Sequence, residues 1–389
     1  MPDLQLIDET GNIRTEPLKP GPAFAKPAGS LRSRVAYAAA HVIPKPWAQN
    51  VPGAPADIDW DATLAFRRHV WSWGLGVADA MDTAQRNMGL DAAATRELIS
   101  RSAAEARAAG GALVVGVNTD HVDDELISLD QVIDAYVSQL EFTEDAGAGV
   151  VLMASRHLSR AAESPSDYER VYSAVLKRAH TPVILHWLGE AFDPVLAGYF
   201  GSNDVATATD TVVRIIESNA NTVSGIKMSL LDAASEIAVR SRLPETASMY
   251  TGDDFNYVDL IAGTAAAPGA YSNALLGAFA ALAPSASAAI QALDRDDSDA
   301  YRRILGPTEE LSRQIFAAPT FYYKTGIAFL SWLNGHQDSF TMVGGLHSAR
   351  SLPHLSEIVR LANGCGAFER PELAAARWND LLALNGVGR

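Results

Sequence analysis

The stretch Ala112-Leu113-Val114-Val115-Gly116-Val117 is followed some thirty residues later by a second apolar run, Gly149-Val150-Val151-Leu152-Met153. Between them, Ser128 precedes a segment with apolar residues at four-residue spacing, and Gly147 ends it. A capping serine before such a segment and a glycine after it are typical of the start and the end of a helix. Two continuous apolar runs joined by a helix predict two parallel strands that are covered on both faces.

The same arrangement recurs along the chain. Eight apolar runs are each followed by a longer segment of helical periodicity, and the runs lie at residues 35–40, 75–78, 112–117, 149–153, 183–186, 223–227, 249–251 and 269–272. Eight strand–helix units within about 250 residues match the size of a closed (β/α)8 barrel, which is the fold we predict. An α/β doubly wound open sheet is the alternative.

The chain divides into three parts by composition. Residues 1–33 form an N-terminal arm, because two short runs flank the turn Thr10-Gly11-Asn12 and a Pro/Gly-rich connector follows. We assign residues 34–293 to the barrel and residues 294–389 to a C-terminal helical region packed on it. Helices are expected at residues 273–293, 297–316, 323–333 and 351–364.

Charge and cysteine content narrow the class of protein. The 389 residues include 46 Asp plus Glu and 31 Lys plus Arg, which gives a formal net charge of -15. This charge repels phosphate backbones and anionic headgroups, so we expect neither nucleic acid nor membrane as a partner. The single cysteine, Cys365, cannot form an intramolecular disulfide, and we see no secretory signal or transmembrane segment, so a cytoplasmic protein is expected.

Several common catalytic signatures are absent from the sequence. It has no GxxxxGK[ST] phosphate loop, no HExxH and no GxSxG, and its two GxG stretches lack the third glycine of a dinucleotide site. We therefore expect no cofactor. In a barrel the reactive groups follow the strands, and the polar residues that follow the predicted strands are His41, Asp79, Asp82, Asn118, Asp120, Arg156, His157, His186, Lys227, Asp253, Asp254, Ser272 and Asn273.

Lys227 is the candidate with the clearest chemistry. It ends the run Thr222-Val223-Ser224-Gly225-Ile226, and a lysine that points into a barrel mouth loses solvation, which lowers its pKa from about 10.4. A neutral amine attacks carbonyl carbons and forms a Schiff base. The alternative is a structural lysine, either on the surface or paired with Asp253.

Gly225-Ile226-Lys227 on the sixth run, Gly252-Asp253-Asp254 after the seventh and Pro182-Val183-Ile184-Leu185 on the fifth together resemble the dihydrodipicolinate synthase and N-acetylneuraminate lyase superfamily of class I aldolases. The resemblance extends over residues 34–335, and Tyr322-Tyr323-Lys324-Thr325-Gly326 resembles the start of one of the late helices of the family. It implies a TIM barrel in which Lys227 forms a Schiff base with a carbonyl substrate. Because relatives are often oligomers, we expect a homo-oligomer.

The sequence departs from the family pattern on the fifth strand. The family has a tyrosine there that shuttles protons to and from the lysine adduct, and this chain has His186 near that position. Histidine transfers protons near neutral pH, because its unperturbed pKa is about 6.5. A hydrogen-bonded core histidine is the alternative.

A second departure follows the second strand, where the family has a Gly-Thr-Thr-Gly-Glu turn that holds the carboxylate of pyruvate. This chain has Asp79-Ala80-Met81-Asp82-Thr83-Ala84-Gln85, in which only Thr83 supplies a comparable hydroxyl. Aspartates repel a substrate carboxylate and accept hydrogen bonds from sugar hydroxyls. A carbohydrate-derived carbonyl compound is therefore a reasonable substrate class, unless Asp79 and Asp82 serve as helix caps or in ion pairs.

The leading hypothesis is a class I lyase, acting on carbon–carbon or carbon–oxygen bonds, with Lys227 and His186 as catalytic residues. Asp82, Thr83, Asp253 and Ser272 are the predicted substrate-binding residues. One alternative is a metal-dependent sugar isomerase or lyase, whose ligands would come from His41, Asp82, Asp120, His121, His186 and Asp253, although no tight ligand spacing marks such a site and the leading hypothesis needs no metal. Another is a barrel that only binds a ligand or partner.

Overall fold

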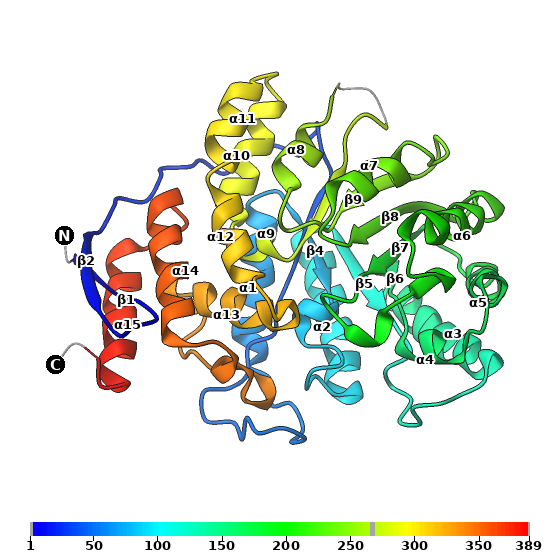
Figure 1. The fold of residues 1–389 in the computed structure, drawn as a ribbon, viewed down its shortest axis with the longest axis horizontal. Helices are drawn as coiled ribbons and strands as arrows, with labels where there is room; N and C mark the ends of the chain where they lie inside the picture. Colours follow the sequence, from blue (N-terminus) through cyan, green and yellow to red (C-terminus); the bar gives the residue numbers. More distant parts are fainter. Residues whose placement is uncertain (1–2, 265–268, 388–389) are drawn as a thin grey trace.

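Eight parallel strands close into a barrel in the order β10-β3-β4-β5-β6-β7-β8-β9. Figure 1 shows the barrel strands with helices around them. The structure, a computed structural model, describes residues 3–264 and 269–387. The barrel strands are β3 (Ala36–Ala39), β4 (Gly76–Asp79), β5 (Leu113–Val117), β6 (Gly149–Leu152), β7 (Val183–Leu188), β8 (Val223–Ser229), β9 (Ser248–Thr251) and β10 (Asn273–Leu276). The predicted (β/α)8 barrel is confirmed.

The eighth strand was predicted at the wrong place. Residues 269–272 form a turn and a loop, and the strand begins at Asn273, where Ala274 pairs with Ala36 of β3 and with Thr251 of β9. The prediction of a helix from residue 273 is wrong for the same reason. Alanine and leucine suit a buried strand and a helix equally, so their continuous run after residue 273 does not mark where one ends and the other begins.

Helices separate successive strands and cover the outside of the barrel. The predicted helix start at Ser128 is confirmed, because Ser128 and Gln131 form a capping box at the start of α3. Pro165 occupies the first turn of α5. These helices are α1 (Trp60–Ser72), α2 (Ala92–Ala109), α3 (Leu129–Asp145), α4 (Arg156–Ala161), α5 (Pro165–Leu176), α6 (Val205–Ser218), α7 (Ala233–Arg240) and α8 (Tyr257–Ala262).

The last third of the chain packs beside the barrel together with the N-terminal hairpin (Figure 1). Strands β1 (Asp3–Ile7) and β2 (Ile13–Pro17) form the expected antiparallel hairpin, and the indole of Trp378 donates to the carbonyl oxygen of Gln5 at 2.6 Å. The helices of this region are α9 (Ala278–Ala281), α10 (Ala283–Leu293), α11 (Ser298–Leu305), α12 (Thr308–Ile315), α13 (Tyr323–Leu333), α14 (Leu352–Cys365) and α15 (Pro371–Leu384).

Two tyrosines fill the barrel at the end where the strands begin. The rings of Tyr37 on β3 and Tyr250 on β9 lie 6.3 Å apart, and glycines face them because a Cβ at Gly76 would stand 2.4 Å from the Tyr37 ring and one at Gly225 would stand 2.8 Å from the Tyr250 ring. The interior is therefore packed at this end. A substrate site is therefore expected at the opposite end of the barrel, at the carboxyl ends of the strands.

A buried ion pair ties α1 to the strand ends. Two guanidinium nitrogens of Arg67 donate to the two carboxylate oxygens of Asp79 at 2.8 and 3.0 Å, and both side chains are fully buried. Arg67 also donates to the carbonyl oxygen of His41 at 2.6 Å. The ends of β3 and β4 are thus held by one side chain from α1.

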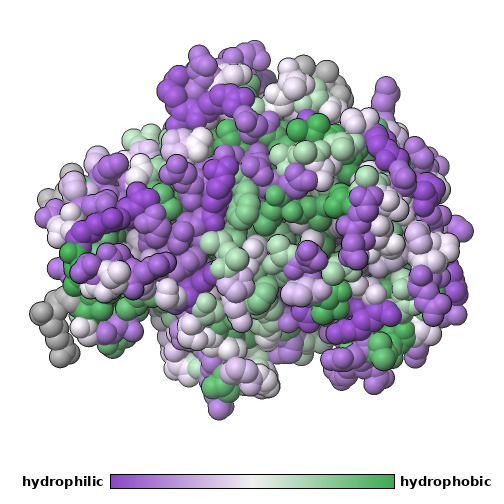
Figure 2. Space-filling model, viewed as in Figure 1, coloured by the Kyte–Doolittle hydropathy of each residue, from purple (hydrophilic) through white to green (hydrophobic). Residues whose placement is uncertain are grey.

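The surface is mostly polar at its edges. On the face seen in Figure 2, apolar residues gather toward the middle and hydrophilic residues cover much of the periphery. Among the described residues, no helix combines the length and apolar character needed to cross a membrane.

Replacing Asp79 by alanine is expected to lower the free energy of unfolding by about 3–5 kcal/mol, because it leaves the Arg67 charge buried without its partner. Chemical denaturation followed by circular dichroism measures this. The matched control is Glu141→Ala, which removes the exposed partner of Arg178 and should change stability by less than about 1 kcal/mol. Equal effects of the two substitutions would contradict this role of Asp79.

Candidate active site

Two neighbouring strands place Lys227 and His186 side by side in the barrel mouth. The two residues are register partners on β8 and β7, and both side chains are buried, with Lys227 5% and His186 0% exposed. Residues that alternate along a strand face the same side, so Ser229 joins them, and the Nε2 atom of His186 lies 3.2 Å from the Ser229 hydroxyl. The structure thus brings together the two residues predicted as catalytic.

The glycine that follows β9 makes room for this lysine. A Cβ at Gly252 would stand 2.8 Å from Cε of Lys227 and 2.1 Å from the Ser229 hydroxyl oxygen. Real Cβ atoms do not approach so closely. The glycine of the Gly252-Asp253-Asp254 motif is therefore a steric requirement of the buried lysine.

Asp82 and Thr83 reach the mouth from the loop after β4. The Tyr323 hydroxyl on α13 donates to Oδ2 of Asp82 at 2.6 Å and lies 2.6 Å from the Thr83 hydroxyl. All three side chains are buried, and no described residue hydrogen-bonds to Oδ1 of Asp82. Tyr323, which is not among the predicted site residues, is therefore part of the polar network.

The loop that carries Asp82 is held in an unfavourable backbone conformation. Ala80, Gln85 and Asn87 have φ values of 48°, 67° and 61°, a region that side chains with a Cβ rarely occupy. Asp79 accepts a hydrogen bond from the amide of Ala80 at 2.8 Å, and the Arg86 guanidinium donates to the carbonyl oxygen of Ala80 at 3.2 Å. The surrounding contacts fix this conformation.

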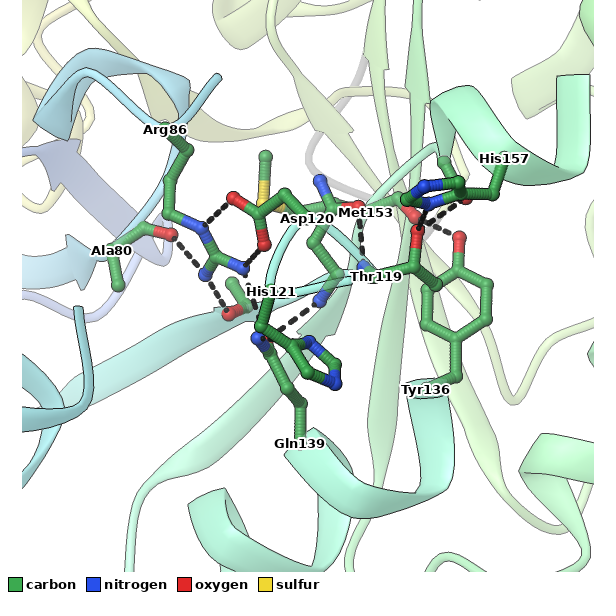
Figure 3. Close-up of polar contacts among 12 residues, drawn as sticks. Ala80, Arg86, Thr119, Asp120, His121, Tyr136, Gln139, Met153 and His157 are labelled. Atoms are coloured by element: carbon green, nitrogen blue, oxygen red, sulfur yellow. Dashed lines mark hydrogen bonds and ion pairs between the residues drawn. The ribbon is translucent and has the colours of Figure 1, made fainter. Parts of the chain in front are cut away.

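Arg86, which the sequence analysis did not identify, anchors the other end of the loop. In Figure 3 its guanidinium points at the Asp120 carboxylate, to which it is hydrogen-bonded through two nitrogens, and it also donates to the carbonyl oxygen of Gly116 at 3.0 Å. Gln139 on α3 accepts a further hydrogen bond from Arg86 at 3.0 Å. No sequence motif marks this arginine, because its partners lie on other strands and helices.

The charges at the mouth oppose the cost of burying an amine. Burial lowers the pKa of the Lys227 amine, and the negative charge of Asp82 counteracts this, as does that of Asp254 once Asp254 is ionised. For Asp82, burial raises the pKa, but the positive charges of Lys227 and Lys324 and the Tyr323 hydrogen bond outweigh this, so the carboxyl stays ionised. Burial, together with the Lys227 charge, holds the pKa of His186 well below its ordinary value, and its imidazole is neutral.

Asp254 behaves differently from Asp82. Burial raises its pKa to about 8, although the amide of Ala278, which donates to Oδ1 at 2.8 Å, and the Lys227 charge act against this. At neutral pH it is therefore mostly protonated. The mouth therefore contains one carboxylate, Asp82, and one carboxylic acid, Asp254. Two carboxyl groups whose pKa values differ in this way can act as a base and an acid.

A second buried lysine borders the same region. Lys324 is 1% exposed, and burial lowers its pKa to about 8. Its Nζ donates to the carbonyl oxygen of Phe321 at 3.1 Å, and it lines a small pocket with Asp82, Arg86, Asn118, Arg156 and Asp193. Of the six lysines in the chain, only Lys227 and Lys324 are buried.

Other predicted site residues are engaged elsewhere. The carboxylate oxygens of Asp253 accept hydrogen bonds from Phe255 and Asn256, the two residues that precede α8. These bonds account for the Asp253 carboxylate within the turn, and its substrate-binding role stays a prediction. Ser272 precedes β10 instead of following it, and its hydroxyl bonds Glu236 and Arg240 of α7. The prediction that Ser272 follows the eighth strand is therefore wrong, and its substrate-binding role stays an untested prediction.

The metal-ligand set considered from the sequence is dispersed. His41 pairs with Gln337, Asp120 with Arg86, and Nδ1 of His121 with Gln139. Within the described ranges, none of the six residues in that set belongs to a group of three potential ligands that lie close together. The geometry gives no support to a metal site at the barrel mouth.

Replacing Asp254 by asparagine tests its unusual protonation. Its pKa in the folded protein, about 8, is above the value of about 3.9 expected on unfolding, so its contribution to stability is full at low pH and is lost as pH rises toward 8. The stability of the wild type relative to Asp254→Asn should therefore fall by about 1.4 kcal/mol per pH unit between roughly pH 5 and 8.

Urea unfolding at a series of pH values measures this difference. Glu141→Gln, which changes an exposed carboxylate, is the control and should show no such slope in this window. A pH-independent difference between the wild type and Asp254→Asn would show that Asp254 is ionised in the folded protein.

Comparison with known protein families matches residues 4–387, nearly the whole chain, to a family described as "Protein of unknown function (DUF993)". No curated protein matches the sequence.

Solved structures match the fold. Dihydrodipicolinate synthase from Aquifex aeolicus is 12% identical with a TM-score of 0.61, covering 91% of this chain and 98% of that one. The 4-hydroxy-tetrahydrodipicolinate synthase from Methylacidiphilum fumariolicum SolV is 16% identical with a TM-score of 0.62, covering 90% and 99%. The dihydrodipicolinate synthase from Bacteroides thetaiotaomicron is 15% identical with a TM-score of 0.61, covering 84% and 98%. The expected resemblance is confirmed for the fold.

Proposed function

The chain belongs to the DUF993 family, and we propose that it is a class I lyase in which Lys227 forms a Schiff base with a carbonyl substrate. The observation that carries this proposal is the buried Lys227 amine, which lies beside a neutral His186 and is influenced by Asp82 and Asp254. Desolvation favours the neutral amine, and only the neutral amine is a nucleophile. The shared fold with dihydrodipicolinate synthases agrees with such a reaction.

The proposed reaction begins with attack of the Lys227 Nζ on the substrate carbonyl carbon. The carbonyl oxygen takes up protons and leaves as water, which gives the imine. In its protonated form the imine accepts the electron pair of the adjacent carbon–carbon bond as that bond breaks. The hydroxyl on the departing carbon gives its proton to a base, so that carbon leaves as an aldehyde or ketone and an enamine remains on Lys227. Protonation of the enamine carbon and hydrolysis release the product and restore the amine.

The neighbouring groups divide the proton transfers between them. Protonated Asp254 is a donor for the departing oxygen, and ionised Asp82 is an acceptor. The Tyr323 hydroxyl lies between Asp82 and Thr83 and can carry a proton from one to the other. Neutral His186 suits the role of a hydrogen-bond partner better than that of a base, because its depressed pKa disfavours the imidazolium that a base must form.

We propose a polyhydroxylated, carbohydrate-derived carbonyl compound as the substrate. The Oδ1 atom of Asp82 is buried, no described residue hydrogen-bonds to it, and a substrate hydroxyl would satisfy it. The Asp79 carboxylate does not serve in this way, because it is paired with Arg67. Lys324 and Arg156 line the adjacent pocket and add positive charge there. This charge would suit an anionic group on the substrate, so 2-oxo acids are among the compounds to be tested.

Sodium borohydride should trap the imine in the presence of the correct carbonyl compound. We expect an irreversible mass increase on the peptide that contains Lys227 when the protein is incubated with a panel of hydroxyaldehydes, hydroxyketones and 2-oxo acids. Peptide mapping by mass spectrometry locates the adduct. Turnover of the trapped compound, and its loss in Lys227→Arg, complete the test.

The control variant is Lys177→Arg, which changes an exposed lysine and should leave trapping intact. An adduct on Lys324 instead of Lys227 would show that Lys324 is the nucleophile and that the assignment to Lys227 is wrong. Turnover of a substrate without any adduct on Lys227 would refute the Schiff-base mechanism.

A further inference from the structure

Three side chains outside the barrel mouth converge on one point. His69 lies in the last turn of α1, His336 follows α13, and Glu369 lies between α14 and α15. The Nε2 atoms of both histidines approach the same carboxylate oxygen of Glu369, His336 at 2.8 Å and His69 at 3.3 Å. The two imidazole rings lie 4.1 Å apart, and the three candidate ligand atoms lie within 4.8 Å of one another.

We propose that His69, His336 and Glu369 form a binding site for one divalent transition-metal ion, with Zn²⁺ as the best match. Two imidazoles and a carboxylate are a common zinc donor set, and the fourth position is then taken by water. Ligand bonds of about 2.0–2.2 Å in a tetrahedral site place ligand atoms about 3.4 Å apart. The separation of 3.3 Å already matches this, and the separation of 2.8 Å requires a shift of about half an ångström.

The surroundings hold the ligands in place. Phe66, buried on α1, packs against both imidazoles, with ring centroids 6.1 Å from His69 and 5.5 Å from His336. The backbone amide of Glu369 donates to Asn334 at 3.0 Å, and Asn334 in turn donates to the carbonyl oxygen of Ala367. Little reorganisation is needed before an ion binds, which favours affinity.

Solvent reaches all three side chains. The histidine side chains are 17% and 18% exposed and that of Glu369 is 25% exposed, so the ion and its water have access to the site.

A metal ion at this point would join separate parts of the chain. His69 belongs to a helix of the barrel, whereas His336 and Glu369 belong to the C-terminal region. An ion that binds the folded protein and not the unfolded chain stabilises the folded state, so it would link the two regions and stabilise their packing. This inference is independent of the proposed lyase chemistry, because it uses none of the residues at the barrel mouth.

The test uses the full-length protein after treatment with a chelator. Titration with Zn²⁺ against a chromophoric chelator should give one tight equivalent per chain, and Glu369→Gln and His336→Gln should each weaken binding by roughly a hundredfold or more. Zn²⁺ should raise the melting temperature of the wild type and not of these variants. His180→Gln is the matched control, because His180 forms an exposed pair with Glu144 without a third ligand, and it should bind Zn²⁺ as the wild type does.

A second probe reports the geometry directly. Co²⁺ bound to the wild type should give the visible absorption of a four-coordinate site, and this absorption should be absent in the double variant His69→Gln/Glu369→Gln. Failure of the wild type to bind one equivalent of Zn²⁺ would overturn the proposal. Tight binding retained by the double variant would overturn it as well, since the ion would then lie elsewhere.

Discussion

The burial of the Lys227 amine is the constraint on which the barrel mouth depends. An amine in a barrel interior loses its hydration, and the protein must either neutralise it or place negative charge nearby. Asp82 and Asp254 supply that charge only in part, because Asp254 keeps its proton up to about pH 8. Gly252 completes the arrangement by leaving space for the lysine side chain. The same features that accommodate the amine leave it more nucleophilic than a lysine in water.

Two buried ion pairs fix the loop that carries Asp82. Asp79 at the start of the loop is bound by Arg67, and Arg86 near its end is bound to Asp120. Between them the chain passes through residues with positive φ, which is costly unless the neighbouring contacts hold it. Such pairs add little net stability, because desolvation offsets their attraction. Their evident effect is to set where the Asp82 carboxylate lies, which is the kind of preorganisation that catalysis uses.

Much of the fold followed from the sequence, because parallel strands covered on both faces require continuous apolar runs. Seven of the eight strands lie where those runs are. The eighth was misplaced, since Ala274-Leu275-Leu276 passes directly into alanine-rich helices and the composition does not change at the boundary. The meeting of Lys227 and His186 also followed, because both lie toward the carboxyl ends of adjacent strands.

The remainder of the site depends on contacts that a single sequence does not display. Asp253 and Asp254 are adjacent and chemically identical, and only the backbone direction lets one bond the turn before α8 while the other lies near the lysine. Tyr323 comes from a helix 241 residues after Asp82. The cluster of His69, His336 and Glu369 likewise joins three distant segments. The most direct test of the central claim is the titration of the Lys227 amine by ¹⁵N NMR in lysine-labelled protein, with the resonance assigned by its loss in Lys227→Arg. Our account predicts a midpoint below the ordinary lysine value of about 10.4, and a midpoint at or above that value would contradict it.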